Sequence, residues 1–324
     1  MKAVVMQRRH GGPEALRMTD LPTPTPKAGE LLVRVQAASV NDWDWGLLQA
    51  TASRRDRLLG HLATPRVTVL GCDVAGRVEA VGAGVEAWQP GDELHADLSA
   101  HGFGAFAEFV CVPATGAARK PPGMSFEQAA AIPQAGMLAV QGLIDAGGLR
   151  PGQRLLLNGA GGGVGTFAVQ LAKLHGAEVT AVDKRGKLEM LRALGADRVI
   201  DFDKQDFTAG KERYDLILDV KTDRSPFAYA RVLARGGSYV TVGGATGRLL
   251  QVLALGLVVS RLQGKRMRLV MLKPNKDLVQ LDRWFEAGSL RPVIDRTYEL
   301  PELPEAFRRF ASGDHHGKIV VKVA

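Results

Sequence analysis

A strand, a glycine-rich turn and a helix follow one another between residues 154 and 174. Residues 154–158 form an apolar run that predicts a buried strand, and an apolar helix is predicted through Leu174. Between them, Gly159, Gly162 and Gly165 recur at every third position. Glycine permits a tight strand-to-helix turn and lets the backbone approach a pyrophosphate at the helix N-terminus. The spacing predicts a dinucleotide-binding turn; a glycine-rich turn without a ligand is the alternative.

The segments that follow the glycine-rich turn alternate between strands and helices. A second strand over 178–183 ends in Asp183, about 20 residues on, where an acidic side chain binds the ribose in such folds. Further strands are expected at 198–200, 215–220 and 238–242, with helices at 187–194 and 227–233. Alternation of this kind predicts a doubly wound α/β domain with a parallel sheet.

The rest of the chain differs from this segment in composition and in the elements that it predicts. Residues 1–122 are rich in glycine, proline and short β-like runs, which predicts a mostly β domain. After residue 274 we expect a helix at 277–287, a strand at 293–298, a helix at 304–310 and a closing strand at 318–323. We expect that strand to return to the N-terminal β domain. The predicted domains are therefore 1–122 with 274–324, and 123–273.

The composition of the chain argues against several classes of protein. Lysine and arginine number 42 against 34 acidic residues, giving a net charge of +8. This charge suits a phosphorylated cofactor, and no RNA-binding, zinc-finger or helix-turn-helix signature favours nucleic acid as the main partner. No apolar run reaches the roughly 18 residues of a membrane span, and the N-terminal segment turns polar too soon for a secretory signal. Two cysteines cannot build a disulfide framework, so we expect a cytoplasmic location.

Motifs spread over nearly the whole chain carry a family resemblance. The chain resembles the zinc-independent quinone oxidoreductase branch of the medium-chain dehydrogenase/reductase superfamily. This resemblance implies a GroES-like β domain, a Rossmann domain and a cleft between them. It also implies an NAD(P)H-dependent enzyme that reduces quinones, enones or related carbonyls, and a homodimer. The segments that carry it are 39–44, 71–78, 90–94, 104–109, 132–136, the glycine loop, 194–197 and 316–320.

The predicted cofactor site gathers the glycine loop and the ends of two strands. It comprises Gly159, Gly162, Gly163, Val164, Gly165, Asp183, Lys184, Arg185, Val242 and Gly243. Asp183 alone favours NADH, because a carboxylate repels the 2′-phosphate of NADPH. The cations that follow it can offset that repulsion. We therefore predict NADPH, with NADH as the alternative.

Zinc is not expected. By the resemblance, Asn41, Cys72 with Asp73, and Gln134 stand where zinc-dependent relatives carry their ligands. Only one soft ligand remains, and a catalytic zinc site needs three protein ligands. We predict no bound metal.

The predicted catalytic residues are Asn41 and Asp44, which match family positions at the nicotinamide end of the cleft. Asn41 could orient the carboxamide or the acceptor oxygen, or cap the turn that follows it. Asp44 could hold that loop rather than act as an acid. Gly46 and Leu138 stand where relatives often carry hydroxyl side chains. Water or a cleft side chain would then supply the proton.

Two further alternatives stay open. The nearly all-apolar segment 249–259, followed by several cations, predicts a helix packed beside the cleft or at a subunit interface; a lipid-facing surface is the alternative. The loss of hydroxyl donors also leaves room for a non-catalytic dinucleotide-binding redox sensor with a basic surface for RNA or a protein partner. Turnover with a small quinone panel would distinguish the two functions.

Overall fold

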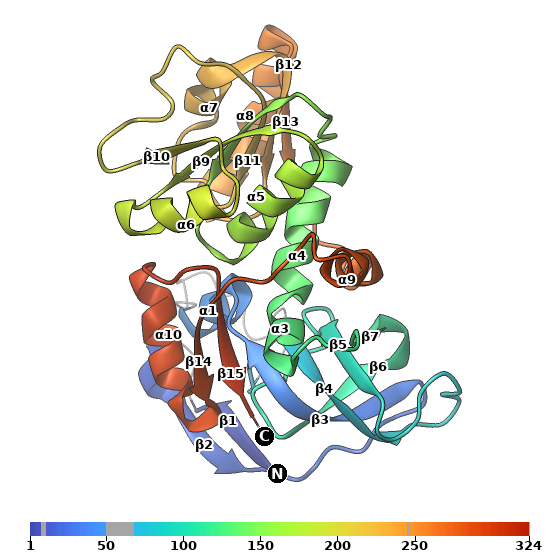
Figure 1. Cartoon of the computed structure of the whole chain (residues 1–324). Helices are drawn as coiled ribbons and strands as arrows, with labels where there is room; N and C mark the ends of the chain where they lie inside the picture. Colours follow the sequence, from blue (N-terminus) through green and yellow to red (C-terminus); the bar gives the residue numbers. More distant parts are fainter. Residues whose placement is uncertain (8–10, 50–67, 245, 324) are drawn as a thin grey trace. The chain divides into compact units, whose positions relative to one another are not determined.

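The computed structural model describes residues 1–7, 11–49, 68–244 and 246–323, which form two compact units (Figure 1). The first unit comprises Met1–Gln134, Pro274–Asp282 and Ile294–Ala324, and the second comprises Ala135–Lys273 and Arg283–Val293. Residues 123–134 thus lie in the first unit rather than the second, because α3 (Phe126–Ala131) packs on the β strands of the first unit. A capping box between Ser125 and Gln128 starts that helix.

A seven-stranded sheet forms the centre of the first unit. Its strands follow the order β14-β15-β3-β4-β5-β7, and β6 also pairs with β3. As predicted, the C-terminal strand returns to this sheet, where Val320 lies opposite Ser39 in an antiparallel pair. The strands are β3 (Glu30–Ser39), β4 (Asp73–Val81), β5 (Glu93–Asp97), β6 (Phe109–Pro113), β7 (Ala118–Arg119), β14 (Ile294–Glu299) and β15 (Lys318–Lys322).

Short helices and a second, two-stranded sheet complete the first unit. The β3 side chains Leu31, Val33 and Val35 are fully buried and share one apolar core with Phe106 and Phe307. Burial of such side chains stabilises the unit by about 1.5–3 kcal/mol each. The remaining elements are β1 (Lys2–Met6), η1 (Gly12–Ala15), β2 (Leu16–Asp20), α1 (Asp42–Gln49), η2 (Ala114–Gly116), η5 (Leu300–Glu302) and α10 (Leu303–Ser312).

The second unit is built on a six-stranded parallel sheet in the order β10-β9-β8-β11-β12-β13. This strand order is that of a doubly wound α/β domain, which is the fold class expected from the sequence. One strand is additional to the prediction: Arg266–Leu269 pairs with β12 and extends the sheet. The strands are β8 (Arg154–Asn158), β9 (Glu178–Asp183), β10 (Arg198–Asp201), β11 (Tyr214–Asp219), β12 (Leu233–Thr241) and β13 (Arg266–Leu269).

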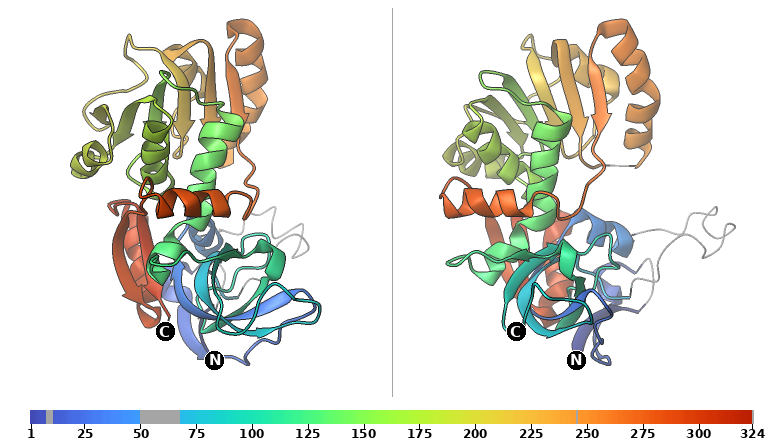
Figure 2. Two further views of the ribbon diagram at one scale, coloured as in Figure 1. Left: turned by 45° about the vertical axis from the view of Figure 1, so that its right-hand side comes forward. Right: turned by 90° about the vertical axis from the view of Figure 1, so that its right-hand side faces the viewer.

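Helices cover both faces of this sheet (Figure 2). Ser225 caps α7 through the N–H of Ala228, and Pro226 occupies its first turn. The helical segments of the second unit are η3 (Gln141–Ala146), α5 (Gly163–Leu174), η4 (Arg185–Lys187), α6 (Leu188–Ala193), α7 (Pro226–Val232) and α8 (Thr246–Gln263), while α4 (Pro133–Val140) and α9 (Leu278–Glu286) have residues in both units. Within the described ranges, none of the helices has the length and apolarity needed to cross a membrane.

Candidate functional site

The glycine loop joins β8 to α5 in the second unit. Gly159 has a φ of +80°, which glycine adopts without strain. A Cβ on Gly165 would lie 2.3 Å from the Ala160 carbonyl oxygen, so this position requires glycine for close helix–strand packing. At Gly162 the nearest atom to a Cβ would be the Gly159 oxygen, 3.8 Å away. The loop is therefore tight at Gly165 and open at Gly162, as a backbone that approaches a ligand must be.

The N-terminus of α5 can hold an anion. Gly162 is its N-cap residue, and among the described side chains none caps it. The first N–H groups of a 12-residue helix then point at the space in front of Gly162, where the helix dipole favours negative charge. This arrangement fits the pyrophosphate of a dinucleotide, and it brings together the predicted residues Gly162, Gly163 and Val164.

Asp183 lies at the end of β9 and is folded into the glycine loop. Its carboxylate accepts hydrogen bonds from the backbone N–H of Gly161 at 2.7 Å and of Lys184 at 2.8 Å. The ammonium of Lys187 lies 3.7 Å from the same carboxylate, and both side chains are buried. A Cβ on Gly161 would meet the Lys187 side chain at 2.5 Å, so that lysine crosses directly over the loop. The loop therefore contains a compensated negative charge.

The other predicted cofactor residues lie at the same edge of the sheet. Lys184 is half-buried and Arg185 is exposed, directly after β9. Val242 follows β12 and donates its N–H to the Asp219 oxygen at 3.1 Å, and the Gly243 oxygen accepts a bond from Thr241. Because β8, β9, β11 and β12 are parallel, their carboxyl ends meet at one edge.

Sequence reasoning missed a buried polar network at this edge. Asp219, at the end of β11, accepts from Asn158 at 2.9 Å and from the Tyr239 hydroxyl at 2.7 Å. Burial raises the pKa of Asp219, while the hydrogen bonds that it accepts oppose the rise. The Tyr229 hydroxyl bonds Asp223 in the same network. In the sequence, the only sign of this network is that each of two apolar strands ends in a polar residue, Asn158 in one and Asp219 in the other. The network fixes the last residue before the glycine loop.

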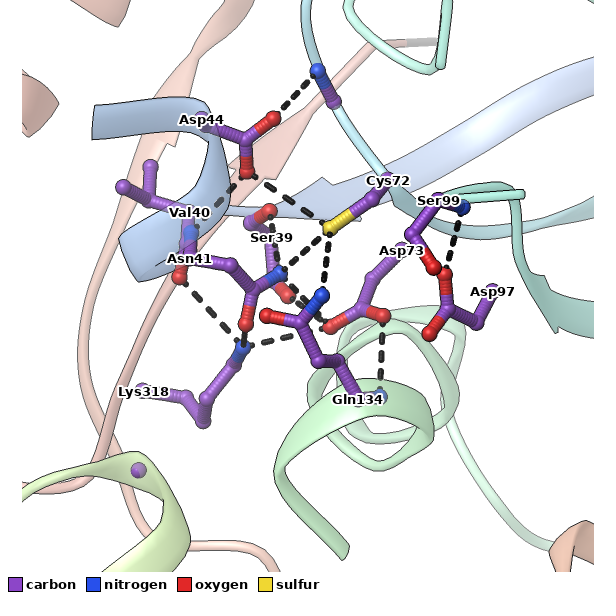
Figure 3. Close-up of polar contacts among 12 residues, drawn as sticks. Ser39, Val40, Asn41, Asp44, Cys72, Asp73, Asp97, Ser99, Gln134 and Lys318 are labelled. Carbon is purple, nitrogen blue, oxygen red and sulfur yellow. Dashed lines mark hydrogen bonds and ion pairs between the residues drawn. The ribbon is translucent and has the colours of Figure 1, made fainter. Parts of the chain in front are cut away.

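A second polar cluster lies in the first unit, around Cys72 and Asp73 (Figure 3). Asp73 accepts hydrogen bonds from the Ser39 hydroxyl at 2.9 Å, from the Asn41 amide at 2.9 Å and from the Gln134 N–H at 3.0 Å. The Asn41 amide also lies 3.2 Å from the Cys72 sulfur, and the Gln134 amide lies 3.4 Å from it. The structure thus brings together the three positions that zinc-dependent relatives would use.

Lys318, from the C-terminal strand β15, enters the same cluster. Its ammonium lies 3.2 Å from the Asp73 carboxylate and 3.3 Å from the Val40 oxygen, and it donates a short bond to the Asn41 side-chain oxygen. Lys318 and Asp73 are both buried. The amide of Asn41 therefore bonds within the first unit at both ends, which is the geometry of a positioning residue. Lys318 lies in segment 316–320, which helps to carry the family resemblance, but no role was predicted for its side chain.

Asp44 holds the loop that precedes α1. Its carboxylate accepts the N–H of Asn41 at 3.0 Å and of Gly71 at 2.8 Å, and the Cys72 sulfur lies 3.7 Å away. Burial raises the pKa of Asp44 to about 7, and the charge of Asp73 adds to the rise. These contacts match the loop-holding alternative for Asp44.

The donors around Cys72 do not fit a catalytic zinc ion. The side chains of Cys72, Asp73 and Asp97 offer ligand atoms within 4.8 Å of one another, but Asp73 is already paired with a buried ammonium. Burial raises the pKa of the Cys72 thiol well above its usual value, and the nearby carboxylates raise it further. Zinc binds the thiolate, and the remaining neighbours, Asn41 and Gln134, are amides.

The helix α8 differs from the expectation that an all-apolar helix is buried. One face packs inward through Val252 and Val259, which are 3% and 1% exposed. The opposite face carries Leu250, Leu253 and Leu257, which are 60%, 53% and 65% exposed. The helix packs on β13 and α7, and these two elements cover only one of its faces. The interface and lipid-facing interpretations of this surface both remain open.

His95 lies on β5 in the first unit. It is fully buried, and its ring bonds the Ala129 oxygen at 3.2 Å and the Asp282 carboxylate at 3.1 Å. Its polar atoms are thus occupied inside the first unit, which is the local hydrogen-bonding role that is most common for such residues.

Comparison with known proteins identifies the family. A model described as the alcohol dehydrogenase GroES-like domain matches residues 27–122, and one described as zinc-binding dehydrogenase matches residues 194–321. The mitochondrial NAD(P)H oxidoreductase RTN4IP1 of Mus musculus is 34% identical over 97% of this chain and 87% of its own length. The 2-methylene-furan-3-one reductase of Solanum lycopersicum is 32% identical over 96% of this chain and 76% of its own length.

Solved structures agree with this result. The quinone oxidoreductase from Coxiella burnetii is 28% identical, with a TM-score of 0.87 over 100% of this chain and 99% of that one. An NAD-dependent alcohol dehydrogenase is 31% identical, also with a TM-score of 0.87, over the whole of both chains. The chain belongs to the quinone-oxidoreductase-like branch of the medium-chain dehydrogenase/reductase superfamily, and it is an enzyme of the medium-chain reductase type.

Proposed function

We propose that the protein is a zinc-independent reductase that transfers a hydride from NAD(P)H to quinones, enones or related carbonyls. The observation that carries the proposal is the glycine loop, open at Gly162 and backed by a helix N-terminus that fits a pyrophosphate. Relatives named as quinone oxidoreductases, as an NADPH-dependent alkenal/one oxidoreductase and as a furanone reductase support this substrate class. The physiological substrate is left open by these names.

The residues of the chain bind and orient rather than form covalent intermediates. A bound reduced nicotinamide supplies the hydride. The α5 N-terminus and the loop glycines hold the pyrophosphate, and positioning of this kind is itself a large part of the rate gain in hydride transfer. Asp44 and Asn41 fix the loop before α1 by internal hydrogen bonds. Glycine at 46 and leucine at 138 offer no hydroxyl donor, so water or another side chain would supply the proton.

We propose NADPH as the preferred cofactor. The charge of Asp183 is compensated by two N–H groups and by Lys187, so it repels a 2′-phosphate less than an isolated carboxylate would. Arg185 is exposed immediately after it and can form a charge-assisted bond to that phosphate. NADH is the alternative.

We propose a cytoplasmic homodimer. The support for dimerisation is the exposed leucine face of α8, beside the last strand in the sheet order, β13. An apolar face of this kind marks an interaction surface more often than a solvated one. Both cysteines are free, as in a reducing compartment. Several relatives are named as mitochondrial or chloroplastic, so cell fractionation tests the location.

Oxidation of NADPH and NADH with a panel of small quinones and enones tests this function. Turnover with at least one acceptor supports the reductase. Tight cofactor binding without turnover of any acceptor contradicts it and favours the dinucleotide-binding redox sensor.

A further inference from the structure

Thr222, which follows the end of β11, has a backbone conformation that its side chain disfavours. Its φ is +48°, in the left-handed region, where a β-branched residue crowds its own backbone. The side chain is nevertheless fully buried. The Asp219 carboxylate accepts the Thr222 N–H at 2.8 Å and the Lys221 N–H at 3.1 Å, which fixes the turn. Strain of this kind persists only where the surrounding contacts impose it, and it is concentrated at functional sites.

The Thr222 hydroxyl joins the end of β11 to the end of β12. It donates a short hydrogen bond to the Gly243 carbonyl oxygen, and the Thr241 hydroxyl donates to the same oxygen at 2.9 Å. The two hydroxyl oxygens lie 2.5 Å apart, and both threonine side chains are fully buried. A valine of the same shape has no group that could make these bonds. The position therefore uses a hydroxyl as well as a left-handed turn.

The same contacts determine the path of the chain after β12. Val242 donates its N–H to the Asp219 oxygen at 3.1 Å. Gly244 has a φ of +127°, and a Cβ there would lie 2.6 Å from the Thr222 Cβ. The two segments are thus in direct contact over residues 242–244. Because Val242 and Gly243 belong to the predicted cofactor site, the Thr222 hydroxyl acts on residues that are expected to contact the dinucleotide.

This contact lies away from the residues that are expected to select between NADPH and NADH. Asp183 and Arg185 follow the start of that edge at β9, whereas Gly243 follows β12, and strands β8 and β11 lie between them. Three strand spacings amount to about 14 Å. The Thr222 hydroxyl should therefore affect a part of the dinucleotide that NADPH and NADH share.

We propose that Thr222 is a positioning residue of the cofactor site, and that its hydroxyl sets the conformation of residues 242–244 for dinucleotide binding. The inference rests on the NAD(P)H-dependent function proposed above and adds to it a residue that acts through Gly243. Glycine would adopt this turn without strain. The hydroxyl is therefore what threonine contributes here in return for the strained backbone.

Three variants separate the hydroxyl from the backbone strain. Thr222→Val keeps the shape and the strain without the hydroxyl, Thr222→Gly removes both, and Thr222→Ser keeps the hydroxyl. Thr208→Val is the matched control, because Thr208 is also buried in the second unit and its hydroxyl bonds Asp206 at 2.7 Å in the segment before β11. For the full chain, fluorescence titration measures the Kd for NADPH and NADH, steady-state assays measure kcat/KM, and circular dichroism on heating measures the melting temperature.

We expect loss of the hydroxyl to weaken both cofactors equally. Thr222→Val and Thr222→Gly should raise the Kd and lower kcat/KM about 10- to 100-fold with NADPH and with NADH, because displaced binding groups lose their alignment. Thr222→Ser should recover most of this loss, because its hydroxyl makes the same bonds. Thr222→Gly should melt at a higher temperature than Thr222→Val, because glycine adopts a positive φ without strain. Thr208→Val should lower the melting temperature and leave both constants unchanged.

The outcomes separate this inference from the proposed function. A folded Thr222→Val or Thr222→Gly with the wild-type Kd for both cofactors would overturn the role of Thr222, and so would a loss confined to NADPH or an equal loss in Thr208→Val. If neither Thr222 variant folds, the residue is needed for structure alone and the role is overturned as well. A wild type that binds NADPH but turns over no acceptor would instead contradict the proposed reductase, while the Kd values still decide the role of Thr222.

Discussion

Replacement of Gly162 by valine should abolish cofactor binding while the fold survives. The backbone there has φ −87° and ψ −176°, an extended conformation that any residue adopts. The nearest atom to a new Cβ is 3.8 Å away, so the cost in stability is about 0.5–1 kcal/mol, because valine is a poorer N-cap residue than glycine. The side chain then occupies the space in front of the α5 N-terminus, where the pyrophosphate must lie.

The expected loss follows from the bonds that the pyrophosphate would no longer make. Two charge-assisted hydrogen bonds at about 1.5–3 kcal/mol each amount to about 3–6 kcal/mol, which is a 100-fold or greater rise in the Kd for NADPH. Fluorescence titration with NADPH measures that constant, and circular dichroism on heating measures the melting temperature.

Gly165→Ala is the contrasting variant. Its Cβ would lie 2.3 and 2.4 Å from the Ala160 and Gly159 carbonyl oxygens. Overpacking of this kind costs about 1–3 kcal/mol and should lower the melting temperature even without cofactor. If Gly162→Val is folded and binds NADPH with wild-type affinity, the placement of the pyrophosphate at this helix is refuted.

Three further predictions concern selectivity, pH and assembly. Arg185→Ala should lower kcat/KM for NADPH by about tenfold or more with little change for NADH, whereas Asp183→Asn should raise the NADPH preference; equal effects on both cofactors would contradict this. Burial opposes ionisation of Asp295, but its hydrogen bonds from Arg309 lower its pKa to about 2. The ionised carboxylate therefore adds about 2 kcal/mol to the free energy of unfolding above about pH 4, and this contribution is lost as the pH falls through about 2. Acid unfolding of Asp295→Asn should lack this loss; an unchanged profile would refute the assignment. Sedimentation should show a wild-type dimer and a Leu253→Glu monomer; a monomeric wild type would favour the lipid-facing interpretation.

The features that sequence predicted well are local in the chain. The glycine spacing of the turn and the apolar runs beside it depend on neighbours within about 20 residues, and they gave the parallel sheet and the loop correctly. The return of residues 318–322 to the first sheet was expected because this β-like run follows the α/β segment, which would then be an insertion in the β domain. The sixth strand, Arg266–Leu269, was missed because it is short and alternates arginine with apolar residues.

The features that could not be predicted from the sequence depend on contacts between residues that are far apart in the chain. Lys318 contacts Asp73 across 245 residues, and no local pattern distinguishes it from the half-buried Lys322 on the same strand. The bond between Asp183 and Gly161 arises only when the loop folds back over the end of β9. The exposed leucines of α8 were missed for a different reason. Composition cannot distinguish a helix that is buried on all sides from one with an uncovered apolar face.

The most direct test of metal-independent hydride transfer is steady-state turnover after metal removal. The purified protein is dialysed against EDTA, its zinc content is measured by elemental analysis, and NADPH oxidation is followed with 1,4-benzoquinone and a simple enone. Because Asp73 is paired with Lys318 and the side chains of Asn41 and Gln134 beside Cys72 are amides, we predict well under one zinc per chain and an unchanged kcat/KM. Turnover that is lost on dialysis and restored by added zinc would contradict the account.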